Sequence, residues 1–151
     1  MLLALVAAAA IAAPIPPPPT KYVTDTPGLL GAETRSALAL ELGRHETTTG
    51  QQVRVWIWPT RPVFALETVE AWAFRTFNGW GLGRAGYDDG LAVFVFVDPP
   101  EQRITVGSGL ELAIPDSDAV RIRRALTADL AAGRADEGIT RAVRELMRLA
   151  R

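Results

Sequence analysis

Two apolar runs joined by one helical pattern constrain the fold of this chain more than any other feature. Residues 53–58 are apolar at five of six positions and stop at Pro59, and residues 91–97 are apolar throughout. Such continuous runs are typical of strands that are covered on both faces. A helical connection lets two neighbouring strands run parallel. The sequence therefore predicts a parallel βαβ unit at the centre of a sheet.

The connecting helix is predicted from apolar residues at helical spacing, followed by an Asn78-Gly79 pair that can end it. The stripe expected to face the core consists of Leu66, Val69, Ala73, Phe77 and Trp80. After the second apolar run, residues 98–101 (Asp-Pro-Pro-Glu) predict a tight turn. Residues 102–106 then alternate polar and apolar, which predicts a half-exposed antiparallel strand and a mixed sheet.

The remaining elements complete a layered α/β domain. Residues 22–24 predict a short strand, and residues 32–45 a helix. Two more helices are expected at 117–132 and 136–149, with these residues inward: Val120, Leu126, Leu130, Ile139, Val143 and Leu146. The prediction is a three-layer α/β/α sandwich with a mixed, mostly parallel central sheet of about four strands. With no internal repeat, residues 21–151 form one domain.

The N-terminal segment predicts export. Residues 1–13 are apolar and uncharged, about as long as the core of a signal peptide and too short to span a bilayer. Ala10-Ile11-Ala12 fits the small-x-small cleavage pattern, and the proline-rich residues 14–20 predict a stiff spacer. We expect a periplasmic or extracellular location. Because a basic leader is missing, an uncleaved membrane anchor and a disordered tail stay open as alternatives.

Composition excludes several function classes. The absence of cysteine excludes disulfides and thiolate metal sites, and a net charge of -1 argues against nucleic acid. His45 is the only histidine and no G-x-S-x-G turn accompanies it, so a Ser-His-Asp triad has no support. The glycines in residues 81–86 follow a helix instead of joining a strand to one, which argues against a nucleotide cofactor.

A candidate metal site follows from the predicted hairpin. The hairpin places Asp88 and Asp89 beside the glycine-rich residues 107–111, which end at Glu111. Three crowded carboxylates are relieved either by a hard divalent cation or by a shared proton with a raised pKa. Oxygen ligands without thiolates favour Ca²⁺ or Mg²⁺ over zinc. The alternative is that Asp89-Gly90 forms an ordinary turn and Glu111 is a solvated loop residue.

Several segments together resemble one family. Residues 22–30 (YVTDTPGLL) are similar to its V-x-D-x-x-x-L-L opening, and residues 77–83 (FNGWGLG) to F-N-x-W-G-I-G. Residues 87–91 (YDDGL) resemble K-D-N-G-V, residues 106–111 (VGSGLE) resemble V-G-x-G-L-E, and residues 114–116 (IPD) resemble L-P-D. In this order they cover nearly all of residues 21–151. The chain resembles the TPM-domain family, which includes exported and thylakoid-lumen phosphatase-like proteins.

The resemblance implies an exported, often membrane-associated domain, in a family where some members bind Ca²⁺ or Mg²⁺ at an acidic cluster. A chloroplast-lumen member with a role in photosystem repair has been described as an acid phosphatase. Carried over by motif, the expected metal ligands are Asp25, Asp88, Asp89 and Glu111, and Asp25 rests on the resemblance alone. Asp89 stands where the family usually has asparagine, which would add an anionic ligand.

Two functions follow as expectations. The first is a non-catalytic, divalent-cation-binding accessory domain for the assembly, repair or maintenance of envelope or membrane protein complexes, with a protein of such a complex as partner. The second is a metal-dependent acid phosphatase in which Arg84 or Arg103 would hold the phosphate. The sequence identifies no catalytic residue.

Overall fold

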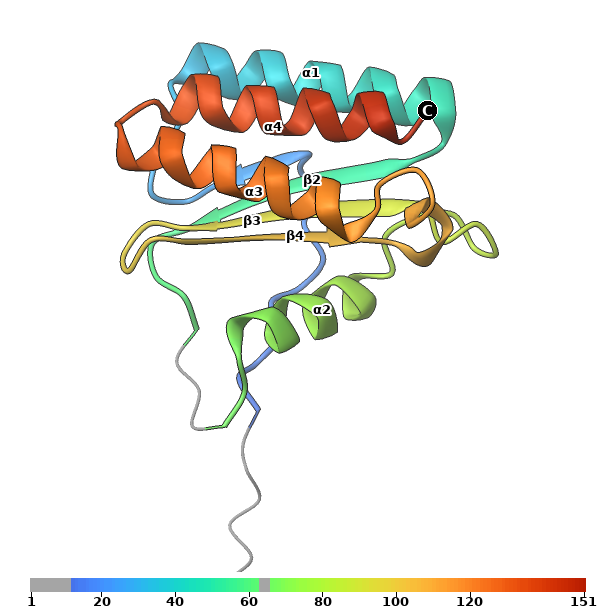
Figure 1. Ribbon diagram of the computed structural model, residues 1–151, viewed down its shortest axis with the longest axis horizontal. Coiled ribbons are helices and arrows are strands. Elements are labelled where there is room, and N and C mark those ends of the chain that lie inside the picture. Colours follow the sequence, from blue (N-terminus) through green and yellow to red (C-terminus); the bar gives the residue numbers. More distant parts are fainter. Residues whose placement is uncertain (1–11, 63–65) are drawn as a thin grey trace, which may run out of the picture.

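The computed structural model of the chain describes residues 12–62 and 66–151, which form a four-stranded sheet with helices on both faces (Figure 1). The strands are β1 (Val23–Asp25), β2 (Gln52–Trp58), β3 (Gly90–Phe96) and β4 (Glu101–Val106). The helices are α1 (Ala32–Thr49), α2 (Val69–Trp80), α3 (Asp116–Ala131) and α4 (Ala135–Leu149), with a 3₁₀ turn, η1 (Ser108–Leu110), after β4. The predicted α/β/α sandwich with a mixed sheet is confirmed.

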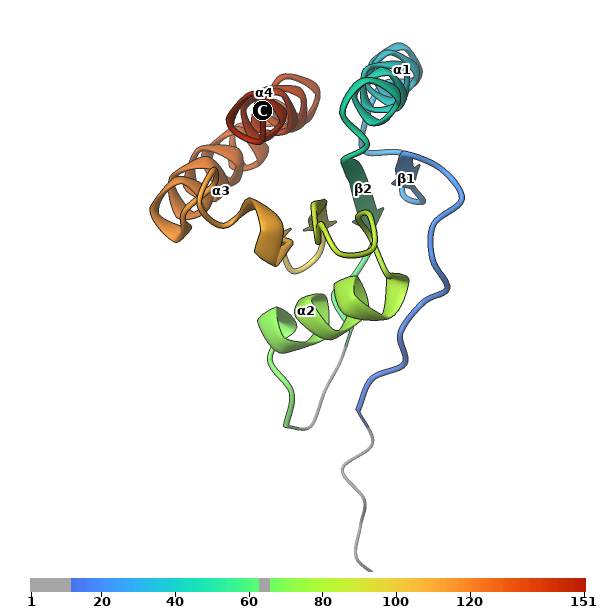
Figure 2. The ribbon, with the colours of Figure 1, turned by 90° about the vertical axis from the view of Figure 1, so that its right-hand side faces the viewer.

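The sheet has the strand order β1-β2-β3-β4, with β1, β2 and β3 parallel and β4 antiparallel to β3. Helix α1 joins β1 to β2 on one face, and α2 joins β2 to β3 on the other (Figures 1 and 2). Because the three strands follow one another in one direction across the sheet, connections on opposite faces have opposite hands. One of the two therefore departs from the usual right-handed rule.

Alternation along the two central strands builds two different cores. On β3, Leu91, Val93 and Val95 face the layer of α1, α3 and α4, whose core is mainly aliphatic. Ala92, Phe94 and Phe96 face α2, where the core is mainly aromatic. Side chains of a strand alternate between the faces of a sheet, so one continuous apolar run supplies both cores.

Two predicted core positions are wrong. Leu66 lies before α2 and is 85% exposed, because Thr68 caps the helix by accepting a hydrogen bond from the Ala71 amide. Val120 is 38% exposed, since α3 turns Ile122 and Leu126 toward the sheet. These errors leave the predicted elements in place and shift only the buried positions.

The N-terminal segment is described only in part. Residues 1–11 of the predicted signal peptide lie outside the described residues. Ala13, the last residue of the predicted signal peptide, is buried in the aromatic core, and Ile15 packs against that core. The first residues of the predicted spacer therefore contact the same core as α2. None of the helices in residues 12–62 and 66–151 combines the length and hydropathy that crossing a bilayer requires.

Candidate functional site

The β3–β4 hairpin brings the predicted acidic loop and the glycine-rich segment together, as expected from the sequence. The Gly107 amide donates to the Gly90 carbonyl at 2.8 Å, and the Gly109 amide donates to the Asp88 carbonyl at 3.1 Å. The Ser108 hydroxyl donates to Oδ2 of Asp88 at 3.3 Å. The segments before β3 and after β4 therefore form one structural unit.

Two glycines make this close approach possible. A Cβ on Gly109 would lie 1.8 Å from the Tyr87 carbonyl oxygen, and a Cβ on Gly107 would lie 2.1 Å from the Asp88 carbonyl oxygen. Contacts this short with backbone atoms cannot be relieved by rotating a side chain. Asp88 itself has a φ of 49°, in the left-handed region. The glycines of the V-G-S-G segment are needed to seat the Asp88 loop.

Asp88 and Glu111 line one pocket of about 580 Å³, which we call the acidic pocket. Its apolar wall comes from α2 and the following loop, including Phe74, Phe77 and Leu82. A second pocket of about 690 Å³ lies along β4 between α2 and α3, and it shares Phe74, Val106 and Glu111 with the first. Phe74 is 60% exposed beside both pockets.

Asp89 does not line the acidic pocket, and its carboxylate binds Arg84 instead. Its Oδ1 accepts from the Arg84 amide at 2.8 Å, and its Oδ2 accepts from Arg84 Nε at 2.8 Å and a terminal guanidinium nitrogen at 2.6 Å. Burial raises the pKa of Asp89, but hydrogen bonds from the Arg84 amide and guanidinium and the guanidinium charge outweigh it and hold the pKa below its ordinary value. The extra negative charge at this position is neutralised within the loop.

We predict that Asp89→Asn lowers the free energy of unfolding at pH 7 by about 1 to 2 kcal/mol, a value reduced by screening because Arg84 is 44% exposed. Folding lowers the pKa, so the ionised carboxylate stabilises the fold at neutral pH. That stabilisation is lost as the pH falls below 3.8, the ordinary value, toward the pKa of the folded state. Urea unfolding of both chains at several pH values measures the difference.

Asp88→Asn, at the exposed neighbouring position, is the control for this prediction and should change stability little. A difference between wild type and Asp89→Asn that stayed constant down to pH 2 would show that the carboxylate charge is not responsible.

Asp25 lies at the other end of the sheet. Its two oxygens accept from the Leu29 and Leu30 amides, both at 2.9 Å, and its side chain is fully buried. It pairs with Ile57 near the end of β2, whereas Gly90, next to Asp89, pairs with Gln52 at the start of β2. Five residues of strand separate those two levels by roughly 16 Å. Asp25 organises the turn into α1 and does not join the other three carboxylates.

As a set, the four predicted ligands do not fit one metal ion. Among the described residues, no group of three or more histidine, cysteine, aspartate or glutamate side chains could hold a metal ion. Asp25 and Asp89 are engaged by backbone amides and by Arg84, which leaves Asp88 and Glu111 facing a common space. Arg84 was considered from the sequence only as a phosphate ligand, and its ion pair with Asp89 was missed. The signal for that pair was an arginine in the loop ahead of an aspartate that directly precedes a buried strand.

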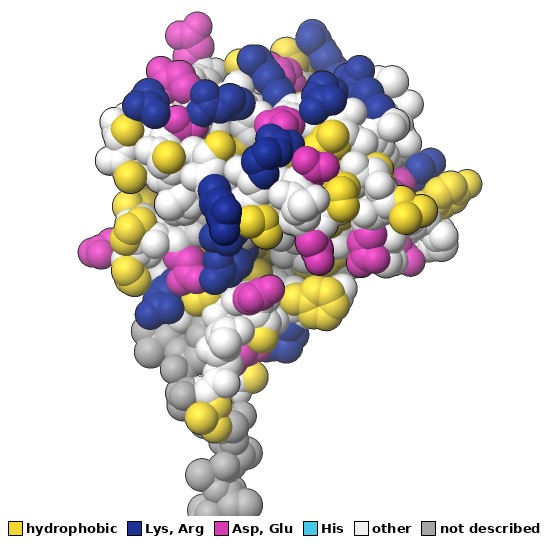
Figure 3. All heavy atoms as spheres, viewed as in Figure 1, with side chains coloured by type: hydrophobic (Ala, Val, Ile, Leu, Met, Phe, Trp, Pro, Cys, Tyr) yellow, Lys and Arg dark blue, Asp and Glu magenta, His cyan; other side chains and the backbone are white. Residues whose placement is uncertain are grey.

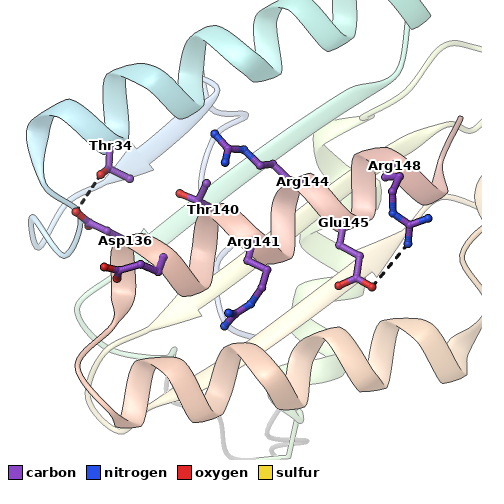
Figure 4. Close-up of a pocket in the computed structure, with 8 residues that line it drawn as sticks. Thr34, Asp136, Thr140, Arg141, Arg144, Glu145 and Arg148 are labelled. Atoms are coloured by element: carbon purple, nitrogen blue, oxygen red, sulfur yellow. Dashed lines mark hydrogen bonds and ion pairs between the residues drawn. The ribbon is translucent and has the colours of Figure 1, made fainter.

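A different pocket, of about 770 Å³, lies beside α4 at its boundary with α1 (Figure 4). Its arginines are paired with acids: Arg144 with Glu41 at 2.5 Å, Arg141 with Asp129, and Arg148 with Glu145 at 3.9 Å. Figure 3 shows basic and acidic side chains interspersed over this part of the surface. These exposed, paired charges form a solvated helical surface.

Comparison with known proteins agrees with this architecture. The family model of the TPM domain matches residues 23–149. The N-terminal domain of a protein from P. gingivalis has a similar structure, with a TM-score of 0.73 and 23% identity over 86% of this chain and 82% of that one. The BA42 protein of the psychrophilic bacterium Bizionia argentinensis has a TM-score of 0.63 and 16% identity over 83% and 84% of the two chains. No curated protein matches the sequence.

Proposed function

This chain belongs to the TPM-domain family, and from that premise we propose that it is an exported, non-catalytic accessory domain that binds a protein of an envelope complex next to the acidic pocket. Its role would be the assembly, repair or maintenance of that complex. The partner would contact the exposed Phe74 and the two pockets that meet there. An exposed aromatic side chain between two hollows is the kind of anchor that protein interfaces use.

One observation favours this proposal over a phosphatase: both candidate phosphate-binding arginines are already bound to carboxylates. The Arg84 guanidinium binds Asp89 and lies 4.1 Å from the centre of the Tyr87 ring. Arg103 binds Glu101 at 2.6 Å and donates to the Gln102 carbonyl. A phosphate group would have to compete with these carboxylates for the guanidinium charge. His45, the only histidine, is buried and its Nε2 contacts Gln51 at 2.7 Å.

Cation binding, as part of this proposal, is confined to Asp88 and Glu111. Mg²⁺ commonly binds through one or two carboxylates and keeps several of its waters, and Ca²⁺ accepts additional hydroxyl and carbonyl oxygens. The acidic pocket contains the two carboxylates and Ser108; Arg84 also lines it, with its charge paired to Asp89. Asp25 is not needed for this site, and Asp89 would act only by holding the loop.

We expect saturating Ca²⁺ or Mg²⁺ to raise the melting temperature of the purified chain by several degrees, because a ligand that binds only the folded state stabilises it. EDTA should reverse the shift, and Asp88→Asn should reduce it. Asp98→Asn is the matched control, since this exposed aspartate lies in the turn at the opposite end of the hairpin. No metal-dependent turnover of p-nitrophenyl phosphate is expected.

The partner is tested by crosslinking in cells. A photoreactive residue at Phe74 should capture an envelope protein, whereas the same residue at Leu40, which is 56% exposed on α1, should not.

Metal-dependent turnover of p-nitrophenyl phosphate that disappears in Asp88→Asn would establish the phosphatase instead. Equal crosslinking from both positions would contradict the proposed docking surface.

A further inference from the structure

The side of the sheet that faces α2 carries an unusually aromatic core. Phe94 is surrounded by Trp72 and Trp80 from α2 and by Trp56 from β2, with ring centres 5.5 to 6.2 Å away. Trp72 and Trp80 are nearly buried, at 1% and 7% exposure. A buried indole needs an acceptor for its N–H. For Trp72 and Trp80, acceptors come from the N-terminal segment that precedes β1.

The acceptors are backbone carbonyls of residues 13–19, which join Ala13 of the predicted signal peptide to the prolines of the predicted spacer and which we call the proline-rich segment. Trp72 Nε1 donates to the Pro14 carbonyl at 3.3 Å, and Trp80 Nε1 donates to the Pro16 carbonyl at 2.9 Å. Arg75 donates to the Ala13 carbonyl at 2.6 Å. Figure 2 shows this segment passing α2 as an extended chain before it reaches β1.

Side chains of the segment also fit this surface. Ala13 is 6% exposed within the aromatic core, and Ile15 packs against the same cluster. Ile15 crosses α2 at Gly79, where a Cβ would come within 3.4 Å of its Cδ1. The contacts of residues 13–16 therefore combine apolar burial with a row of three hydrogen bonds.

The chemistry of the two sides is complementary in a specific way. Indole and guanidinium groups donate hydrogen bonds and do not accept them. A proline has a carbonyl acceptor and no N–H, so it can lie on an apolar surface without burying an unpaired donor. Its fixed φ also reduces the entropy lost on docking, which is why proline-rich peptides are recurrent ligands of aromatic surfaces.

We propose that Trp72, Arg75 and Trp80 form a binding site for proline-rich peptides, and that its resident ligand is this chain's own segment 13–19. The segment is a docked ligand tethered through residues 20–22 to β1. Tethering holds the effective concentration of the ligand high, so the site is occupied in the intact chain. The site is separate from the acidic pocket and does not depend on the function proposed for it.

The test uses the ¹⁵N-labelled full chain with the substitutions Ile15→Asp and Pro16→Gly, which place a charge against the aromatic surface and free the segment. The probe is a synthetic peptide with the sequence of residues 13–21. It should bind this variant saturably and return the Trp72 and Trp80 indole NMR signals to their wild-type positions. Wild type should respond much less, because its own segment competes. Adding Trp80→Phe, which keeps an aromatic ring but removes the N–H, should weaken peptide binding roughly two- to tenfold.

A folded variant that fails to bind the peptide would overturn the proposal. If the variant does not fold, hydrogen exchange of the wild-type chain decides. A docked ligand can leave without global unfolding, so the Trp72 and Trp80 indole protons should exchange faster than the slowest β3 amides. Indole protons that exchange only with those amides would mean that residues 13–19 are an inseparable part of the core.

Discussion

Gly109→Ala is expected to lower the free energy of unfolding by roughly 2 to 4 kcal/mol and to displace the Asp88 loop. The added Cβ would lie 1.8 Å from the Tyr87 carbonyl oxygen, and the Gly109 amide that binds the Asp88 carbonyl would have to move with it. Because both sides of the contact are backbone, the loop and η1 must separate. Urea unfolding measures the loss of stability, and backbone NMR shifts of residues 87–90 report the displacement.

Ser108→Ala is the matched control, since it adds no atom and removes only the 3.3 Å hydrogen bond to Asp88 from an exposed position. It should cost about 0.5 kcal/mol. If Gly109→Ala were as stable as Ser108→Ala, the close contact between the two loops would not be a property of the folded chain. Any cation-induced melting shift should also be smaller in Gly109→Ala, because Asp88 would no longer be held beside the acidic pocket.

The hairpin end of the site could be predicted because its register depends on local chemistry. A short turn between an apolar run and an alternating run fixes which residues lie opposite, and Leu91 does pair with Val106. Asp88 and the glycine segment meet for that reason. Asp25 could not be assigned in the same way, because a motif match gives residue identity but no position along the sheet.

The predicted role of Asp89 as a metal ligand failed for a different reason. A carboxylate near the sheet edge can bind a metal ion only if no arginine or lysine of the chain already neutralises it. Arg84 lies five residues away in a loop containing Gly83 and Gly86, both with positive φ, and that loop folds back onto Asp89. Such a path has no helical or strand period from which sequence reasoning could derive it.

The proline-rich segment illustrates the limit of composition. A run of prolines indicates a stiff, extended backbone, and this predicted a spacer. Stiffness does not say whether the segment is solvated or docked. Its contacts depend on Trp72 and Trp80, more than 50 residues away in the sequence. Trp80 was predicted only as a core residue, and Trp72 was not singled out.

Phe94→Ala is expected to lower the free energy of unfolding by about 3 to 5 kcal/mol, a large part of the total for a domain of this size. Phe94 is fully buried and contacts Trp56, Trp72 and Trp80. Its removal leaves a cavity, and the cavity can close only if these large rings move out of their packed positions. Urea unfolding gives the energy, and near-ultraviolet circular dichroism reports the loosened tryptophans.

The same substitution at the exposed Phe74 separates burial from residue type. Phe74→Ala removes the same atoms from α2 but should cost less than about 0.5 kcal/mol, because the ring is 60% exposed. The two variants should also differ in function: Phe94→Ala should loosen residues 13–19 by moving Trp72 and Trp80, while Phe74→Ala should leave them docked and weaken only the contact with a partner beside the acidic pocket. Equal stability of the two variants would mean that the aromatic core does not hold α2 to the sheet.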